Sequence, residues 1–246
     1  MDVTLLILLF FIGFAQRFVA TLAGSGGLIS FPAMLILGVP VHAAIAANKL
    51  STTAGSFSGF LSLVKGKEIA FRNFYRIAPI ALLGGSAGGL IASYLSDHTL
   101  KVLAVILLCF AFFIGFLKQR RPDQPFHNRL SKKMYAAIFG TSVYNGAFGP
   151  GQGTLLMQML FYEGVPYLQS VGLKQISTFV SSAAAAVVFI SSGYMLWHIA
   201  IPLTLGSMVG VHAALKVAHK LSKQHVKWFI RIITFFLIIQ LIVQLY

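Results

Sequence analysis

Acidic side chains are scarce in this sequence. Charged residues of both signs make up 10% of its 246 residues, and Asp and Glu together number five. A soluble globular domain carries about 25% charged residues, so this composition excludes an ordinary soluble fold. Cysteine is nearly absent as well. The one thiol, Cys109, lies inside an apolar run, and an intrachain disulfide is therefore excluded.

Long apolar runs take the place of charge. Three of them, at 4–24, 101–117 and 228–246, approach or exceed the length needed to cross a bilayer, about 18–20 residues. The first run lacks the basic start and the cleavage site of a signal peptide, so we interpret it as a membrane span. These runs predict an all-α polytopic integral membrane protein of the cell membrane.

Basic residues are concentrated in short polar segments between these runs. The formal net charge of +14 could suggest a nucleic-acid partner. Most of the basic side chains, however, fall in two clusters: Lys65, Lys67, Arg72 and Arg76, then Lys118, Arg120, Arg121, Arg129, Lys132 and Lys133. Such clusters flank spans on the cytoplasmic side, where they meet anionic lipid. We therefore expect membrane lipid and no nucleic acid as a partner, with both clusters in the cytoplasm.

The sequence contains an internal repeat. GVP at 38–40, NKLST at 48–52 and LSDHTLK at 95–101 return in the same order as GVP at 164–166, KQIST at 174–178 and LSKQHVK at 221–227. Self-similarity of this kind indicates a duplicated structural unit. We predict an N-terminal transmembrane repeat at 1–117, a basic cytoplasmic linker at 118–133 and a C-terminal transmembrane repeat at 134–246.

Each repeat contains a glycine-broken helix, with AGSGG at 23–27 and GAFGPGQG at 146–153. A small-residue helix and two further spans follow, which predicts about eight transmembrane helices in two tandem four-helix repeats. Both termini would then share the cytoplasmic side, although the four lysines of 216–227 would fall on the opposite face. If the broken segments re-enter the membrane instead of crossing it, the repeats are inverted, and the sequence leaves both arrangements open.

The polar segment NKLST is expected deep in the membrane. Because a helix rises about 1.5 Å per residue, Gly24 and Lys49 lie about 15–21 Å from the turn at Gly38, on its two sides. The glycine break and the lysine therefore reach a similar depth. The second repeat places its own break and Lys174 in the same way around Gly164.

This depth favours an anion as the bound species. Broken backbone is tolerated inside a membrane where it faces protein or a water-lined cavity, and a helix that begins there presents free N–H groups and its positive end. The acidic residues all lie in loops or at span ends: Asp2, Glu68, Asp97, Asp123 and Glu163. No carboxylate at depth can neutralise Lys49 or Lys174, or hold a metal ion. We therefore expect a passing anion to pair with these lysines.

Simpler roles remain open for several residues. The two lysines could bond to backbone carbonyls without touching a substrate. Hydroxyls that could merely satisfy carbonyls one turn away are those of Ser51, Thr52, Ser177 and Thr178. The glycines of 84–89 are typical of close helix packing. His42 and His212 fit structural roles. Arg17 is either a further cation near the anion or an interfacial side chain.

Several motifs resemble the TauE/SafE family of anion permeases, also called the sulfite exporter family. They are AGSGGLISFPAMLILGVPVHAAIAANKL in the first half, and YNGAFGPGQG and LKQISTFVSS in the second. Members of this family move sulfite, sulfonates and related small anions, mostly outward. The sequence departs from the family at Ala20 and Asn145, where an acidic residue is common, and at Ser177 and Ser182, where asparagines are expected. These departures bear on proton coupling and on the exact substrate.

The resemblance and the residues together predict a secondary transporter, and more specifically an exporter, of small anions such as sulfite or organosulfonates. The anion would bind between the repeats near the bilayer midplane. The candidate binding residues are Gly24, Ser25, Gly26, Gly27, Asn48, Lys49, Ser51, Thr52, Asn145, Gly149, Gly151, Gln152, Gly153, Lys174, Gln175, Ser177 and Thr178. We expect no catalytic residue, metal or cofactor, and the oligomeric state is left open.

Two other functions compete with this prediction. The first is an anion channel of the same architecture. The second is an intramembrane enzyme that modifies lipid, which would need clustered histidines or carboxylates for acid–base or metal chemistry. The seven histidines are scattered through the sequence, so we expect no enzyme.

Overall fold

A computed structural model describes residues 3–23, 26–66, 72–114 and 130–217, together with Phe235 and Ile239. Within these residues the chain is helical and has no strands. The helices are α1 (Val3–Ala23), α2 (Gly27–Ile36), α3 (Val41–Lys65), α4 (Arg72–Tyr94), α5 (Asp97–Ile114), α6 (Lys132–Ala147), α7 (Gln152–Tyr162), α8 (Tyr167–Ser191) and α9 (Trp197–Val217). Most of the predicted linker and nearly all of the last apolar run lie outside the described residues.

Three of these helices are long and apolar enough to cross a membrane. Among the described residues they cover Val3–Thr21, Phe74–Tyr94 and Gln169–Ser191. The shorter apolar helix Gly27–Ile36 does not reach this length. The prediction of an all-α protein with membrane-spanning helices is therefore confirmed, whereas the number of crossings stays a prediction.

Two Gly-Val-Pro turns separate the short helices from the long ones that follow. Gly38 and Gly164 adopt φ values of 78° and 77°, a left-handed conformation that glycine adopts without strain. The amide of Val39 then donates back to the carbonyl of Met34 at 3.1 Å, which closes the end of α2. Proline at the next position cannot continue that helix and begins another one. Two separate halves of the sequence thus build the same turn.

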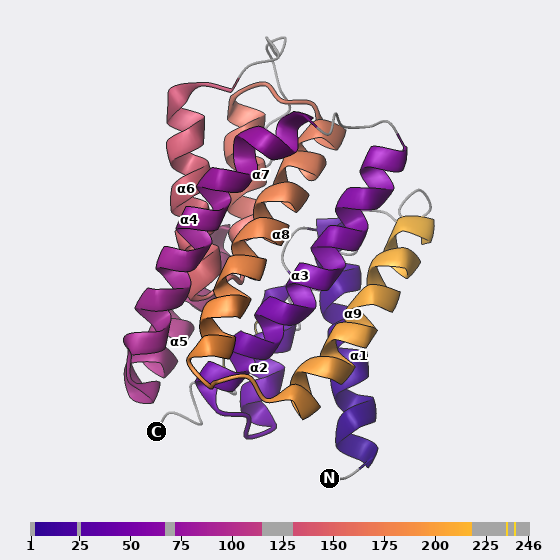
Figure 1. The fold of residues 1–246 in the computed structure, drawn as a ribbon. Coiled ribbons are helices and arrows are strands. Elements are labelled where there is room, and N and C mark those ends of the chain that lie inside the picture. Colours follow the sequence, from indigo (N-terminus) through magenta and orange to yellow (C-terminus); the bar gives the residue numbers. More distant parts are fainter. Residues whose placement is uncertain are drawn as a thin grey trace.

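The two halves of the chain run in opposite directions (Figure 1). In the view of Figure 1, α1 rises from the lower end and α2 returns toward it, whereas α6 descends from the upper end and α7 returns upward. Likewise α3 rises where α8 descends, and α4 descends where α9 rises.

This arrangement corrects one expectation from the sequence. With eight crossings, the N-terminus would lie on the same side as the segment 65–76. The structure instead places the start of α1 at the end opposite to the C-terminal end of α3 and the start of α4 (Figure 1). The reason is that α1 and α2 form a hairpin, so the chain turns back at the first glycine break. The sequence had left this re-entrant arrangement open.

All the described helices except α5 form two bundles, each of which includes one helix from the other half of the chain. The first bundle contains α1, α2, α3 and α9, and the second contains α6, α7, α8 and α4. In the first bundle α1 and α3 both pack against α9, and in the second α6 and α8 both pack against α4. The bundles meet along α3 and α8.

Glycine allows the helices within each bundle to approach closely. A Cβ at Gly206 would overlap the backbone of Phe10, and one at Gly88 would overlap the carbonyl oxygen of Val143. A Cβ at Gly85 would likewise overlap the backbone of Ser181. The glycines of 84–89 therefore serve helix packing, as the sequence indicated.

Two apolar clusters lie on either side of a polar layer. One cluster includes Phe31, Met34 and Ile45, and the other includes Phe60 and Leu160. Along α3 the chain passes from the first cluster, through the polar segment 48–52, to the second cluster. On α3, the polar segment therefore lies between the two apolar clusters.

Candidate functional site

The polar layer contains a cavity that both bundles line in equal parts. We call it the central cavity. The first bundle contributes Gln16, Arg17, Ala20, Gly26, Gly27, Asn48, Lys49 and Thr52, and the second contributes Asn145, Gly149, Gly151, Gln152, Gly153, Lys174, Gln175 and Thr178. Its volume is about 50 Å³. Since about 10–15 Å³ suffices for one water, the cavity has room for roughly three to five waters or a compact ion of similar bulk.

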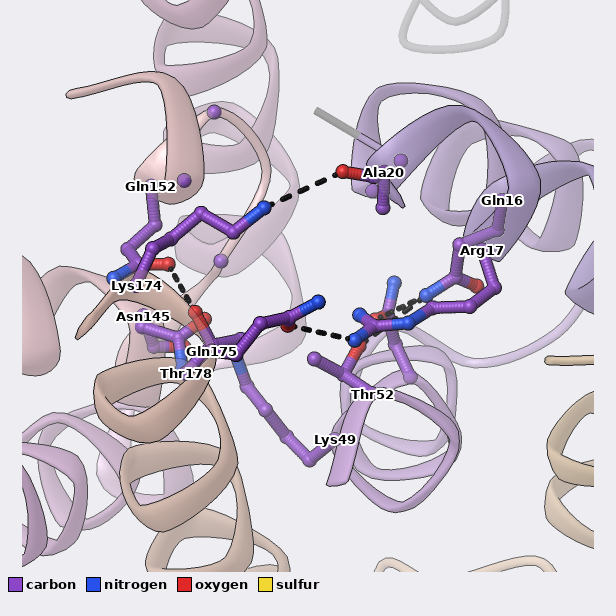
Figure 2. A pocket seen from close by; sticks show the side chains of 16 residues that line it. Gln16, Arg17, Ala20, Lys49, Thr52, Asn145, Gln152, Lys174, Gln175 and Thr178 are labelled. Carbon is purple, nitrogen blue, oxygen red and sulfur yellow. Dashed lines mark hydrogen bonds between the residues drawn. The ribbon is translucent and has the colours of Figure 1, made fainter. Parts of the chain in front are cut away.

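Each lysine of the cavity reaches across to the opposite bundle. Lys49 on α3 donates to the carbonyl of Asn145 and, at 3.1 Å, to that of Phe148, at the end of α6. Lys174 on α8 donates at 3.4 Å to the carbonyl of Ala20, in the last turn of α1 (Figure 2). A helix ends in unpaired carbonyls that favour a cation, so each lysine stabilises the helix end at the other half's break.

The beginnings of α2 and α7 face the same cavity. Gly26 and Gly151, the residues that precede these helices, line it, and neither provides a side-chain cap for the first turn. Gly149 and Gly151 adopt φ values of 105° and 84°, which lets the backbone turn sharply at the second break. Two helix N-termini without side-chain caps thus direct their positive ends toward one place.

Amide and hydroxyl side chains form a network on each side of the cavity. In the first bundle, Gln16 Nε2 donates to Asn48 Oδ1 at 3.1 Å, and Asn48 Nδ2 donates to Ser30 Oγ at 2.9 Å. In the second, Thr178 donates to Gln152 Oε1 at 3.0 Å. These bonds hold the amide groups in fixed orientations around the cavity.

The positive charge of the cavity has no carboxylate beside it. Lys49, Lys174 and Arg17 are 2%, 6% and 3% exposed, so bulk water does not compensate their charge. Of the acidic residues that the structure describes, Asp97 pairs with His42 at 2.5 Å and Glu163 accepts hydrogen bonds from Ser131. Neither lines the cavity. An anion is the partner that would compensate this buried charge.

Some of the predicted residues lie elsewhere. Ser51 donates to the carbonyl of Leu203 at 3.2 Å, and Ser177 bonds to the hydroxyl of Ser142 at 3.2 Å, so both serve helix contacts and neither lines the cavity. Gly24 and Ser25 lie outside the described residues. The other predicted residues line the cavity, and their role in binding stays a prediction.

The histidines left open by the sequence lie away from the cavity. His42 stacks on Tyr194 with ring centroids 4.1 Å apart, and it bonds to Asp97 at one end of the molecule. His212 is exposed, and its Nδ1 lies 2.8 Å from the carbonyl oxygen of Met208 on the same helix, to which it can donate a hydrogen bond. Across the residues that the structure describes, no group of three His, Cys, Asp or Glu side chains could hold a metal ion.

Three lining residues were missing from the predicted set, namely Gln16, Arg17 and Ala20. The sequence left Arg17 undecided between a cation near the anion and an interfacial side chain. The structure shows it buried at the cavity, with Nη2 donating to Ser56 and Gln175. A signal was available: Gln16 and Arg17 are adjacent polar residues inside an apolar run, and Ala20 lies one turn later on the same helix face.

Comparison with known proteins identifies the family. Residues 9–241 match the family described as sulfite exporter TauE/SafE. The chain belongs to this family. A Sinorhizobium protein named "Probable membrane transporter protein ORF9" is 28% identical over 242 residues, which cover 97% of this chain and 92% of that protein. A Haemophilus influenzae "Probable membrane transporter protein" is 26% identical over 95% of this chain and 92% of its own length.

A third relative is more distant. The Escherichia coli "Probable membrane transporter protein YfcA" is 24% identical over 84% of this chain and 78% of its own length. No solved structure matches the chain significantly. Family membership and the apolar helices together make the chain an integral membrane protein of the TauE/SafE transporter family, as its motifs indicated.

Proposed function

We propose that the chain is a secondary transporter that exports small anions such as sulfite or organosulfonates across the cell membrane, and that it is not an enzyme. The central cavity is the proposed binding site. One observation carries this proposal: three buried cationic side chains from two bundles surround one cavity that no described carboxylate lines. Uncompensated buried charge is costly, so the site gains free energy when an anion enters.

Two further features support binding between the bundles. The N-termini of α2 and α7 supply backbone donors from opposite bundles, as in transporters whose broken helices meet at the bilayer midplane. Lys49, Lys174, Asn48 and Gln175 supply side-chain donors from both bundles. The anion would therefore contact both bundles at once, and these contacts would change when the bundles move relative to each other.

The opposite directions of the two halves favour inverted repeats. We assign the described helices α1–α5 to the repeat at 1–117 and α6–α9 to the repeat at 134–246. Equivalent helices have equivalent partners, since α1 packs on α9 as α6 packs on α4. A protein built in this way can adopt two conformations, related by a pseudo-two-fold axis in the membrane plane, that open the cavity to one side or to the other. The apolar cluster on each side of the cavity would serve as the barrier that opens.

A carrier fits these barriers better than a channel does. A channel needs a continuous polar path, but buried apolar residues such as Phe31 and Phe60 lie on the two sides of the cavity. An intramembrane enzyme has less support, since the described residues of the cavity contain no histidine and no carboxylate. Acid–base and metal chemistry usually depend on such groups.

Counterflow in liposomes tests the proposal. Liposomes that contain the purified protein and unlabelled sulfite receive a trace of labelled sulfite outside, with the membrane potential held at zero. A carrier should accumulate the label transiently above its external concentration, whereas a channel would only equilibrate it. Taurine, sulfoacetate and sulfate are then compared as internal anions. Absence of uptake for all four would rule out the proposed function.

A further inference from the structure

Arg17 is held at the cavity by neutral groups alone. Its Nη2 donates to Ser56 Oγ at 2.9 Å and to Gln175 Oε1 at 3.0 Å, and Figure 2 shows the guanidinium directed toward Gln175. Neither acceptor carries a charge. The side chain is 3% exposed, so solvent does not neutralise it either. The structure therefore orients this charge without cancelling it.

The neighbouring helix is shaped to receive this side chain. A Cβ at Gly55 would lie 2.5 Å from Arg17 Nε, so only glycine at this position of α3 leaves room for the guanidinium. If the purpose were only to link α1 to α8, a neutral amide could make similar hydrogen bonds without the cost of a buried charge. The placement of Arg17 thus points to a use for the charge itself.

Arg17 adds a permanent charge to the two lysines of the cavity. A guanidinium stays protonated in proteins, whereas a lysine can lose its proton when it is buried. A monovalent anion would compensate only one of three cationic side chains around a cavity with no carboxylate among its described residues. A divalent anion would compensate two of them.

We propose that Arg17 makes the central cavity selective for small dianions over monoanions of the same size and shape. The planar fork of a guanidinium suits an oxyanion, since it can donate two parallel hydrogen bonds to a pair of oxygens. This assignment rests on the proposed function, because it assumes that the central cavity binds the transported anion.

Sulfate and methanesulfonate provide a matched pair of probes. They have nearly the same size and tetrahedral shape but differ by one charge, because a methyl group replaces one oxygen. Binding of each anion to the purified protein is measured by calorimetry for the wild type, Arg17→Gln, Arg17→Lys and Gln175→Glu. The ratio of the two dissociation constants is compared between variants, so that the different hydration of the two ions cancels.

The wild type should prefer sulfate, and Arg17→Gln should reduce this preference at least tenfold, which corresponds to about 1.4 kcal/mol. Gln175→Glu should reduce it similarly, because the new carboxylate would neutralise Arg17 without removing it; this variant decides the matter if Arg17→Gln does not fold. Arg17→Lys keeps a charge that burial can remove and lacks the planar fork, so it should retain less of the preference than the wild type.

Two results would overturn the assignment while leaving the proposed function intact. These are a wild type without preference, and a preference that survives both Arg17→Gln and Gln175→Glu. Binding of neither anion, nor of sulfite, to the wild type would instead contradict the proposed function.

Discussion

At the scale of single residues, the two lysines of the cavity differ in how many of their donors the protein already uses. Lys49 contacts two backbone carbonyls, whereas Lys174 contacts one at 3.4 Å. An ammonium group has three N–H donors, so Lys174 retains more of them for an anion. Both lysines therefore bond to backbone carbonyls, which is the simpler role that the sequence left open, and both also line the cavity.

Replacing either lysine by methionine should weaken anion binding. A hydrogen bond from a charged group contributes about 1.5–3 kcal/mol, so Lys49→Met and Lys174→Met should each raise the dissociation constant about tenfold to a hundredfold. Calorimetric titration with sulfite measures the change. Lys65→Met is the matched control, because Lys65 is exposed at the end of α3 and should not affect binding. Unchanged binding in the purified Lys49→Met, Lys174→Met double variant would remove these residues from the site.

Gly149→Ala should reduce transport, because the added methyl group would displace the side chain of Lys49. The residue has a φ of 105°, and an added Cβ would lie 2.8 Å from Lys49 Nζ. A non-glycine residue in such a conformation costs about 1–3 kcal/mol, and the lysine would also have to move. Gly140→Ala on the exposed face of α6 is the control, since its Cβ would meet open space. Equal transport rates in the two variants would contradict this explanation.

At the scale of helices, local chemistry allowed some features to be predicted and left others open. The breaks and the Gly-Val-Pro turns depend on glycine and proline, whose effects are local, so they could be read from the sequence. Whether α1 and α2 cross the membrane or form a hairpin depends on packing between distant segments, and apolar patterns do not record chain direction. Ser51 shows the same limit: its spacing matched that of the candidate binding residues, but its partner is Leu203 on a helix from the other half.

Gly88→Ala tests the close packing of α4 on α6. The added methyl group would overlap the carbonyl oxygen of Val143. Because this oxygen belongs to the backbone of α6, the overlap can be relieved only if α4 and α6 move apart. Overpacking of this kind typically costs about 1–3 kcal/mol, so the thermal unfolding temperature in detergent should fall. Gly140→Ala should instead leave it unchanged or raise it slightly, because alanine in a helix is favoured over glycine by about 0.5–1 kcal/mol. A melting temperature for Gly88→Ala equal to that of the wild type would show that these helices are not in contact.

At the scale of the whole molecule, basic residues gather at one end. Lys65, Arg76, Lys132 and Lys216 lie at the ends of α3, α4, α6 and α9 that share the upper end in Figure 1. The lysines of 216–227 had seemed to oppose the predicted orientation. The end of α9 instead lies on the same side as the first basic cluster. By the positive-inside rule, we expect this end to face the cytoplasm.

Cysteine accessibility tests this orientation. In a Cys109→Ser background, a cysteine at Asn73 should resist an impermeant thiol reagent in intact cells, because the start of α4 lies at the basic end. A cysteine at Ser192, in the exposed turn before α9 at the other end, should react. Permeabilised cells should label both positions, which controls for expression and reactivity. The reverse labelling pattern would place the basic end outside.

The driving force of transport follows from which groups surround the cavity. A membrane potential changes the energy of one charge by about 2.3 kcal/mol per 100 mV, so a negative cell interior drives anions outward without a coupled ion. No carboxylate or histidine is found among the described residues of the cavity, and Ala20 and Asn145, where the family resemblance led us to look for an acid, both line it. His42 and His212 lie away from it. We therefore expect transport to follow the voltage and the anion gradient.

Liposomes with a pH gradient and a potential clamped at zero test this expectation. Sulfite should not accumulate beyond the level explained by trapping of its protonated form, and a fully ionised sulfonate, which cannot be trapped in this way, should not accumulate at all. An imposed potential without a pH gradient should move both anions. Accumulation of the sulfonate by the pH gradient alone would contradict voltage-driven transport. Lys49 and Lys174 would then be the residues to examine, because a buried lysine is the kind of group in this cavity that can take up and release a proton.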